Sequence, residues 1–195
     1  MEGRLLFYII QVEDLLLPFN PIGIRTTSFA FLFVYIDRQA GRQAAFWRHS
    51  MQNKVYIVQS DSDLRDCFHV LKELRNHLDF ESFSSIYRSC KDREQFELAA
   101  LRDNKQIVAV MGFRFITDFV RGKHLYIDDL VTISTERSKG HGAALLFYAQ
   151  EIAKKSNCSG LRLCAVLENE SGIKFYERNG WTKRAYAFTK KIDSI

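Results

Sequence analysis

The feature that most constrains the fold is a glycine-containing polar stretch between a strand-like segment and a helix-like one. Residues 125–132 are typical of a β-strand that the Asp128-Asp129 pair interrupts, and residues 143–155 form the pattern of an amphipathic helix. Between them lies Arg137-Ser138-Lys139-Gly140-His141-Gly142. Glycine lets backbone amides approach an anion closely, and a helix N-terminus adds unpaired N–H groups and a positive dipole end. The stretch therefore predicts a phosphate-binding loop in an α/β fold.

This loop differs from two common nucleotide-binding motifs. It lacks the Gly-Lys-Ser/Thr ending of a Walker loop, and Leu145 stands where a dinucleotide fingerprint has its third glycine. A long turn also separates the strand from the loop. The motif thus indicates a phosphate-bearing ligand of another class.

The rest of the pattern after residue 50 predicts a mixed α/β sheet flanked by helices, in the order β-α-α-β-β-β-α-β-α-β. The expected strands are residues 54–59, 96–102, 106–116, 125–132, 161–167 and 181–192, and the expected helices are residues 64–78, 83–90, 143–155 and 171–178. Ser60 to Asp63 offer N-caps for the first helix.

The first fifty residues have a different character. They hold both prolines and five arginines but no lysine. Their apolar residues follow neither the two-residue period of a strand nor the 3.6-residue period of a helix. We expect residues 1–50 to be an N-terminal extension of uncertain order and residues 51–195 to be the domain. The alternation of Phe29, Phe31, Phe33 and Tyr35 leaves open a partner-binding arm or a homodimer.

Composition excludes several classes of protein. The longest apolar run, residues 29–36, is far short of the roughly 18–20 residues that span a bilayer, so we expect no membrane segment. Four scattered cysteines show no metal-ligand spacing, which favours reduced thiols, a cytoplasmic protein and no metal site. The net charge of +5 suits a phosphate-bearing cofactor and does not require nucleic acid.

Two motifs resemble the GCN5-related N-acetyltransferase (GNAT) family. Val131-Thr132 followed by Arg137-x-x-Gly140-x-Gly142 resembles the family's (Arg/Gln)-x-x-Gly-x-(Gly/Ala) loop, which holds the pyrophosphate of acetyl-coenzyme A (acetyl-CoA). Asn169-x-x-Gly172-x-x-Phe175-Tyr176-x-x-x-Gly180-Trp181 resembles the family's Asn-x-x-Ala-x-x-x-Tyr-x-x-x-Gly-Phe segment. The resemblance covers residues 52–192 and implies a GNAT-like sheet that is splayed at its centre.

The resemblance also implies a set of residues that bind acetyl-CoA. Strand backbone groups would meet the pantetheine arm, main-chain N–H groups of the loop would wrap the pyrophosphate, Asn169 would bind the pantetheine side, and Tyr176 would face the sulfur. The strand residues are Leu130, Val131 and Thr132, and the loop residues are Arg137, Ser138, Lys139, Gly140, His141, Gly142 and Ala143.

Acyl transfer to an amine needs a base for the ammonium and benefits from an acid for the departing thiolate. Tyr176 is the expected acid, and Asp128 is the first candidate base, followed by Asp129 and Glu168. The Asp128-Asp129 pair falls where the family's fourth strand commonly bulges. Some relatives place a carboxylate on the fifth strand, where this chain has Cys164. Packing roles for Tyr176 and local hydrogen bonding for the aspartates remain open alternatives.

The sequence therefore predicts an N-acetyltransferase. It would transfer an acetyl group from acetyl-CoA, by direct attack, to a primary amine of a small molecule or of a protein or peptide. The alternative is a non-catalytic acetyl-CoA-binding module that acts as a sensor or an assembly partner. Binding without transfer would identify that alternative.

Overall fold

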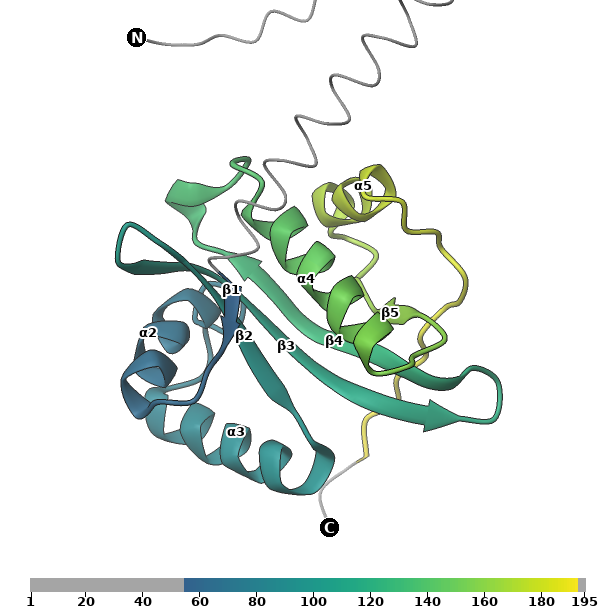
Figure 1. Ribbon diagram of the computed structural model, residues 1–195, viewed down its shortest axis with the longest axis horizontal. Coiled ribbons are helices and arrows are strands. Elements are labelled where there is room, and N and C mark those ends of the chain that lie inside the picture. The colour runs from purple at the N-terminus through teal and green to yellow at the C-terminus, as the bar shows by residue number, and fades with distance from the viewer. Residues whose placement is uncertain (1–54, 193–195) are drawn as a thin grey trace, which may run out of the picture. The chain divides into compact units, whose positions relative to one another are not determined.

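The computed structural model describes residues 55–192 of the 195-residue chain. Five strands form one sheet in the order β1-β2-β3-β4-β5 (Figure 1). The strands are β1 (Val55–Ile57), β2 (Glu97–Asp103), β3 (Gln106–Asp118), β4 (Gly122–Thr132) and β5 (Leu161–Leu163). The expected extension at residues 1–50, with its aromatic alternation, lies outside the described residues.

The first four strands pair antiparallel, whereas β5 pairs parallel to β4 after a helical crossover. Asn104 and Lys105 join β2 to β3 with φ values of 45° and 71°. Two successive residues with positive φ make the tight turn whose twist suits a hairpin. The predicted turn at this place is therefore correct.

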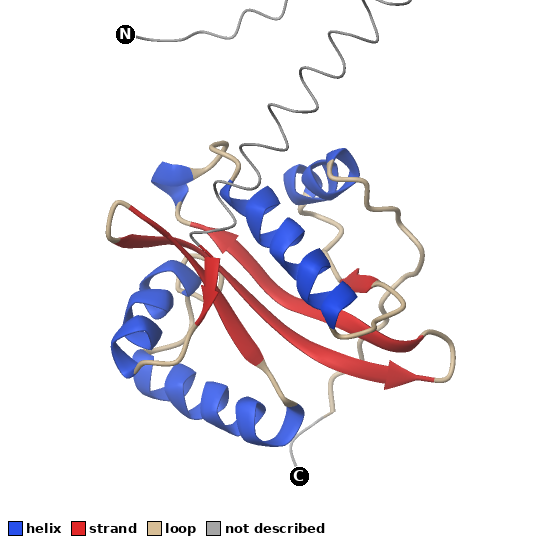
Figure 2. Ribbon diagram, viewed as in Figure 1, coloured by secondary structure: helices blue, strands red, loops and turns tan. Residues whose placement is uncertain are grey.

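Helices cover both faces of the sheet, and the strands run between the two helical groups (Figure 2). The helices are α2 (Asp61–Leu71), α3 (Phe80–Glu94), α4 (His141–Lys155) and α5 (Glu170–Arg178). Helices α2 and α3 pack with Leu98, Ala100 and Val110 on one face. Helix α4 packs with Ala99, Leu101 and Met111 on the other, where the partly buried side chains of α5 join it. Within residues 55–192, no helix combines the length and the hydrophobicity needed to cross a bilayer.

The helix starts follow from side-chain caps. Ser60 Oγ accepts a hydrogen bond from the Asp63 N–H at 3.1 Å, and Asp79 Oδ1 accepts one from the Ser82 N–H at 2.7 Å. Each cap satisfies an N–H group that has no partner within its own helix. The Asp79 cap also explains why α3 begins earlier than the expected residues 83–90, and Gln95 ends it in the left-handed conformation.

A β-bulge in β4 interrupts its pairing with β3. Gly112 pairs with Asp129 and Phe113 pairs with Ile127, so Asp128 is the extra residue. The parallel pairing of β4 with β5 covers Leu125 to Ile127 and ends there. The expected bulge at the aspartate pair and the expected splay of the sheet are both present.

The mixed α/β class with a splayed sheet is confirmed, but the strand expected at residues 181–192 is wrong. Residues 182–192 are exposed and form no strand. Tyr186 and Phe188 alternate in a strand-like way, yet strand propensity makes no ladder without a partner strand. Strand β5 ends at Leu163 rather than at Leu167, so it presents little edge for such pairing.

Gly112 offers a test of the packing behind the bulge. A Cβ at Gly112 would lie 2.5 Å from Phe96 Cζ, so Gly112→Ala overpacks the core beside Asp129. We expect it to lower the free energy of unfolding by about 1–3 kcal/mol in denaturant titration. Gly160→Ala is the control, because nothing lies within 4 Å of a Cβ there, and it should change stability by less than about 0.5 kcal/mol. Equal stability of the two variants would contradict this packing.

Candidate functional site

The bulge at Asp128 changes which residues of β4 point their N–H and C=O groups away from β3. Before it, the Leu125 N–H donates to Gly160 O at 3.1 Å, so odd-numbered peptide groups face β5. After it, the Ile133 N–H donates to Val108 O at 2.9 Å, on the β3 side. Peptide groups alternate along a strand, and one extra residue shifts the alternation. Leu130 and Thr132 therefore direct their peptide groups away from β3, along an edge of β4 (residues 128–132) that no described strand pairs.

The phosphate-binding loop predicted from the sequence joins this edge to α4. A short 3-10 helix, η2 (Ser134–Glu136), precedes it, and Gly140 is the N-cap of α4 with a φ of 89°. No side chain within residues 55–192 caps α4, so none of them occupies the N–H groups of its first turn. An anion suits such a helix end, because unpaired N–H groups and the helix dipole point at it.

Glu73, in the turn after α2, holds the loop in place. Its Oε1 accepts hydrogen bonds from the Ser134 N–H at 2.9 Å and from Ser134 Oγ at 3.1 Å. Its Oε2 accepts from Arg137 Nη2 at 2.8 Å, while Arg137 Nε donates to Thr132 O at 3.2 Å. Sequence reasoning missed Glu73, because nothing local marks a contact between residues more than 60 positions apart.

Gly142 is explained here by packing between helices. A Cβ at Gly142 would lie 3.1 Å from Phe175 Cζ, which tightens the contact of α4 with α5. The sequence assigned this glycine to close approach of a phosphate. The structure adds that α5 leaves little room for a side chain there.

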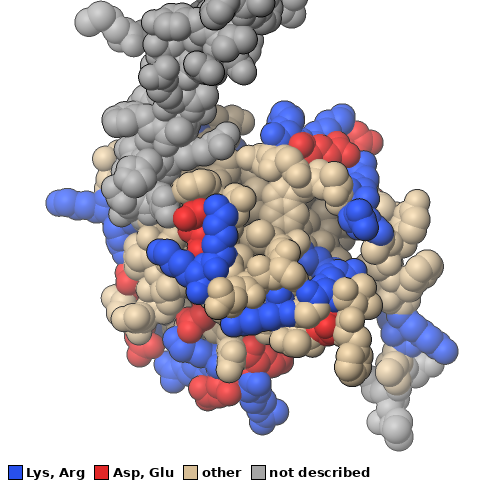
Figure 3. Space-filling view, turned by 45° about the vertical axis from the view of Figure 1, so that its right-hand side comes forward, with Lys and Arg blue, Asp and Glu red and all other residues tan. Residues whose placement is uncertain are grey.

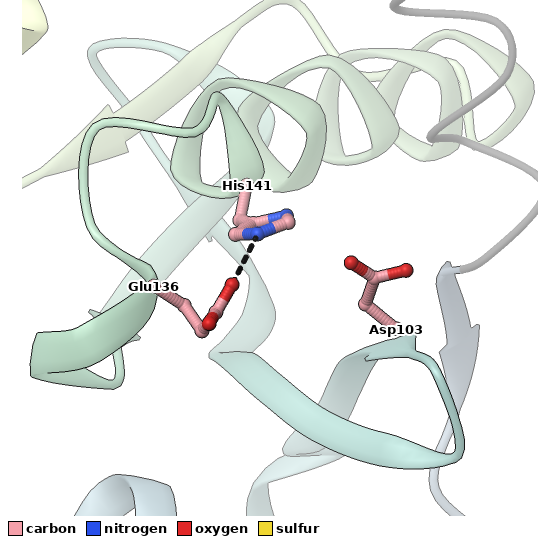
Figure 4. Close-up of side chains that lie close together, drawn as sticks. All are labelled: Asp103, Glu136 and His141. Carbon is pink, nitrogen blue, oxygen red and sulfur yellow. Dashed lines mark ion pairs between the residues drawn. The ribbon is translucent and has the colours of Figure 1, made fainter. Parts of the chain in front are cut away.

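The side chains of His141 and Lys139 both reach Glu136 but differ in exposure. His141 is 4% exposed, and its Nε2 lies 3.6 Å from Glu136 Oε2 (Figure 4). Lys139 is exposed and pairs with the same Glu136 oxygen at 2.8 Å. The imidazole therefore points into the protein, away from the solvent side of the loop.

Asn169 begins α5 as its N-cap. Its Oδ1 accepts a hydrogen bond from the Gly172 N–H at 2.9 Å. A Cβ at position 172 would lie 2.4 Å from Asn169 Nδ2, so glycine suits this cap better than the alanine of the family pattern. The side chain is exposed, and no described residue accepts a hydrogen bond from its Nδ2 group.

Tyr176 lies on the α4 and α5 face with its ring against Phe175 and Trp181, at centroid distances of 5.3 Å and 6.1 Å. Burial raises the pKa of Tyr176 above its usual value of 10.0. The hydroxyl therefore keeps its proton at neutral pH. Protonation is what a general acid requires.

Asp128 and Asp129 lie at the bulge with an arginine each. Arg114 donates from Nε and Nη2 to the two Asp128 oxygens at 2.9 Å and 2.7 Å. Arg75 binds Asp129 Oδ1 from Nε at 2.9 Å and from Nη2 at 2.7 Å, whereas no described residue donates to Asp129 Oδ2. Asp128 is thus held through both oxygens and Asp129 through one.

A further polar group, missed from the sequence, adjoins the aspartates. Tyr126 pairs with Arg114 across the strands, and burial, aided by the nearby Cys164 thiol, raises the pKa of Tyr126 to about 12. Arg114 also pairs with Glu94 at the end of α3. These groups make the α2 and α3 side of the site polar.

The structure does not bring Tyr176 into contact with the aspartates. Tyr176 packs with the α4 cluster, whereas Asp129 is beside Gly112 and Phe96 on the α2 and α3 face. Glu168, the other candidate base, is exposed in the loop before α5. In the view of Figure 3, uncharged side chains fill the middle of the surface and Lys and Arg side chains lie around them.

Comparison with known proteins places the chain in a family. The model of the acetyltransferase (GNAT) family matches residues 60–181. YhdJ of Bacillus subtilis, named as an uncharacterized N-acetyltransferase, is 33% identical over 136 residues, which are 69% of this chain and 96% of YhdJ.

Solved structures share the fold. A GNAT family acetyltransferase of Staphylococcus aureus has a TM-score of 0.59 at 19% identity, over 71% of this chain and 97% of that one. An aminoglycoside N-acetyltransferase solved in complex with CoA has a TM-score of 0.63 at 11% identity, over 72% of this chain and 95% of that one. The family model and the match to YhdJ show that the chain belongs to the GNAT family and is an acetyltransferase.

Proposed function

We propose that this protein transfers an acetyl group from acetyl-CoA to a primary amine of a small molecule or of a protein or peptide. The observation that carries the proposal is the bulge at Asp128. It ends the pairing of β4 with β5 and turns the peptide groups of Leu130 and Thr132 toward the unpaired edge of β4. From that edge the chain continues through η2 and the loop to the start of α4, which no described side chain caps.

The residues of this region fit acetyl-CoA. Its pantetheine arm carries amide groups, which match the Leu130 peptide group and the Thr132 N–H on the edge that no described strand pairs, and the Asn169 Nδ2, which has no described acceptor. Its pyrophosphate matches the first-turn N–H groups of α4, with Arg137 and Lys139 adding positive charge. The binding set is Leu130, Val131, Thr132, Arg137, Ser138, Lys139, Gly140, His141, Gly142, Ala143, Asn169 and Tyr176. In this set, His141 acts through its main chain, because its side chain points inward.

When bound, acetyl-CoA supplies the acetyl group as a thioester, whose carbonyl carbon is open to attack by an amine. Tyr176 donates a proton toward the sulfur, since its raised pKa keeps the hydroxyl protonated. The amine enters from the α2 and α3 side, where the aspartates lie. In this proposal the thioester of acetyl-CoA and the incoming amine meet where β4 and β5 stop pairing.

Of the two aspartates, Asp129 is the better base in this structure. A base must present a free oxygen to the ammonium proton, directly or through one water. Asp129 Oδ2 has no donor among the described residues, while both oxygens of Asp128 bind Arg114. We assign proton acceptance to Asp129 and positioning of the bulge to Asp128.

The donor site is tested by adding one negative charge at the start of α4. Gly140→Glu should weaken acetyl-CoA binding at least about tenfold in calorimetric titration, because the carboxylate competes with the pyrophosphate for the helix end. Gly180→Glu is the matched control, because Gly180 has a similar φ of 82° and nothing within 4 Å of a Cβ. Equal loss in both variants, or in neither, would count against the proposed cradle.

The base is tested by comparing Asp129→Asn with Asp128→Asn. We expect Asp129→Asn to lower kcat about 10²- to 10⁴-fold without changing acetyl-CoA affinity, because the amide cannot accept the proton. Asp128→Asn should have a smaller effect on kcat. The measurement is release of the CoA thiol with a panel of primary amines and amine-bearing peptides. Wild-type protein that binds acetyl-CoA and transfers to none of them would favour the non-catalytic module.

The acid is tested with Tyr176→Phe. We expect a lower kcat at unchanged acetyl-CoA affinity, since the ring still packs between Phe175 and Trp181 but has no proton to give. Because burial raises the pKa of Tyr176, ionisation of its hydroxyl should cause no fall in wild-type kcat below about pH 10. A kcat equal to that of the wild type would leave Tyr176 a packing residue only.

A further inference from the structure

Three side chains of types that can ligate metals lie close together next to the loop. They come from three parts of the chain. Asp103 ends β2, Glu136 ends η2, and His141 opens α4 (Figure 4). One ligand atom of each residue lies within 4.8 Å of the other two. Sequence spacing hides this group, because Asp103 is 33 positions before Glu136.

His141 is the residue that points to a bound ligand in this cluster. His141 is 4% exposed, and neither its Nδ1 nor its Nε2 has a hydrogen-bond partner among residues 55–192. Buried polar atoms almost always make a hydrogen bond, so an imidazole whose one polar contact in the described residues is an ion pair at 3.6 Å needs an explanation. The ring points toward both carboxylates in Figure 4.

We propose that Asp103, Glu136 and His141 bind one divalent transition-metal ion, zinc above all. An imidazole nitrogen with two carboxylate oxygens suits zinc and its neighbours better than Mg²⁺ or Ca²⁺, which prefer oxygen ligands alone. Two carboxylates also balance the charge of a divalent ion. Tetrahedral zinc with bonds of about 2.0–2.2 Å places its ligand atoms about 3.3–3.6 Å apart, so side-chain rotations must bring these three groups closer than their present limit of 4.8 Å.

Lys139 would compete with the ion. Its ammonium lies 2.8 Å from Glu136 Oε2, the same oxygen that faces His141 Nε2. Metal binding therefore displaces Lys139 from Glu136. The inference does not depend on acetyl transfer, because these three side chains form the site whatever the loop binds.

The experiment titrates the purified full-length protein with Zn²⁺, and in parallel with Mn²⁺ and Mg²⁺, by calorimetry. We expect one Zn²⁺ per chain, with weaker Mn²⁺ binding and no Mg²⁺ binding. Glu136→Gln and Asp103→Asn should each weaken Zn²⁺ binding at least about tenfold. Circular dichroism checks that each variant is folded.

Two controls separate the ligand from its ion pair. Glu151→Gln is the control for Glu136→Gln. Glu151 also pairs with a lysine three residues later, Lys154 at 2.9 Å, and its side chain is about as exposed as that of Glu136. This variant should bind Zn²⁺ like the wild type. Lys139→Gln breaks the Glu136 ion pair but keeps all three ligands, so its Zn²⁺ affinity should equal or exceed that of the wild type.

X-ray absorption at the zinc edge identifies the ligands. Nitrogen and oxygen neighbours without sulfur are expected, because none of the three residues is a cysteine. The proposal is overturned if folded wild-type protein binds no Zn²⁺, if Glu136→Gln and Glu151→Gln bind it equally, or if sulfur ligands dominate the spectrum.

Discussion

One extra residue in β4 determines which peptide groups of that strand face β3. The bulge at Asp128 shifts the alternation of the strand, so the peptide groups that would continue the pairing with β5 turn toward β3 instead. The pairing with β5 then ends at Ile127, and no described strand pairs with the edge that follows. The same residue brings two carboxylates to the α2 and α3 face. The donor edge and the acidic pair thus have one structural cause.

The turn after α2 links these two sides. Glu73 binds Ser134 and Arg137 of the loop region, and Arg75 binds Asp129 at the bulge. Both arginines are well exposed, so each pair contributes little to stability. Their effect is positional, because one short segment holds the approach to α4 and one oxygen of Asp129.

Sequence reasoning succeeded where the signal was local. Neighbouring residues are enough to predict four features: the strand before the loop, the helix after it, the Ser60 cap and the Asp103–Lys105 turn. The expected bulge came from resemblance to a family rather than from periodicity. What the sequence did not predict depends on distant partners. Three contacts between distant segments illustrate this: the arginines that bind Asp128 and Asp129, the hydrogen bonds of Glu73 to Ser134, and the proximity of Asp103 to His141. The final strand was predicted wrongly for the same reason, since a strand exists only beside another.

The most direct test of the account is residue-resolved amide hydrogen exchange with and without acetyl-CoA. The account predicts that acetyl-CoA slows exchange at Leu130, at Thr132 and in the first turn of α4. Val131 should change little, because the alternation that follows the bulge turns its N–H toward β3. Protection confined to other parts of the chain, or equal protection of Leu130 and Val131, would contradict the claim that the bulge creates the donor-binding edge.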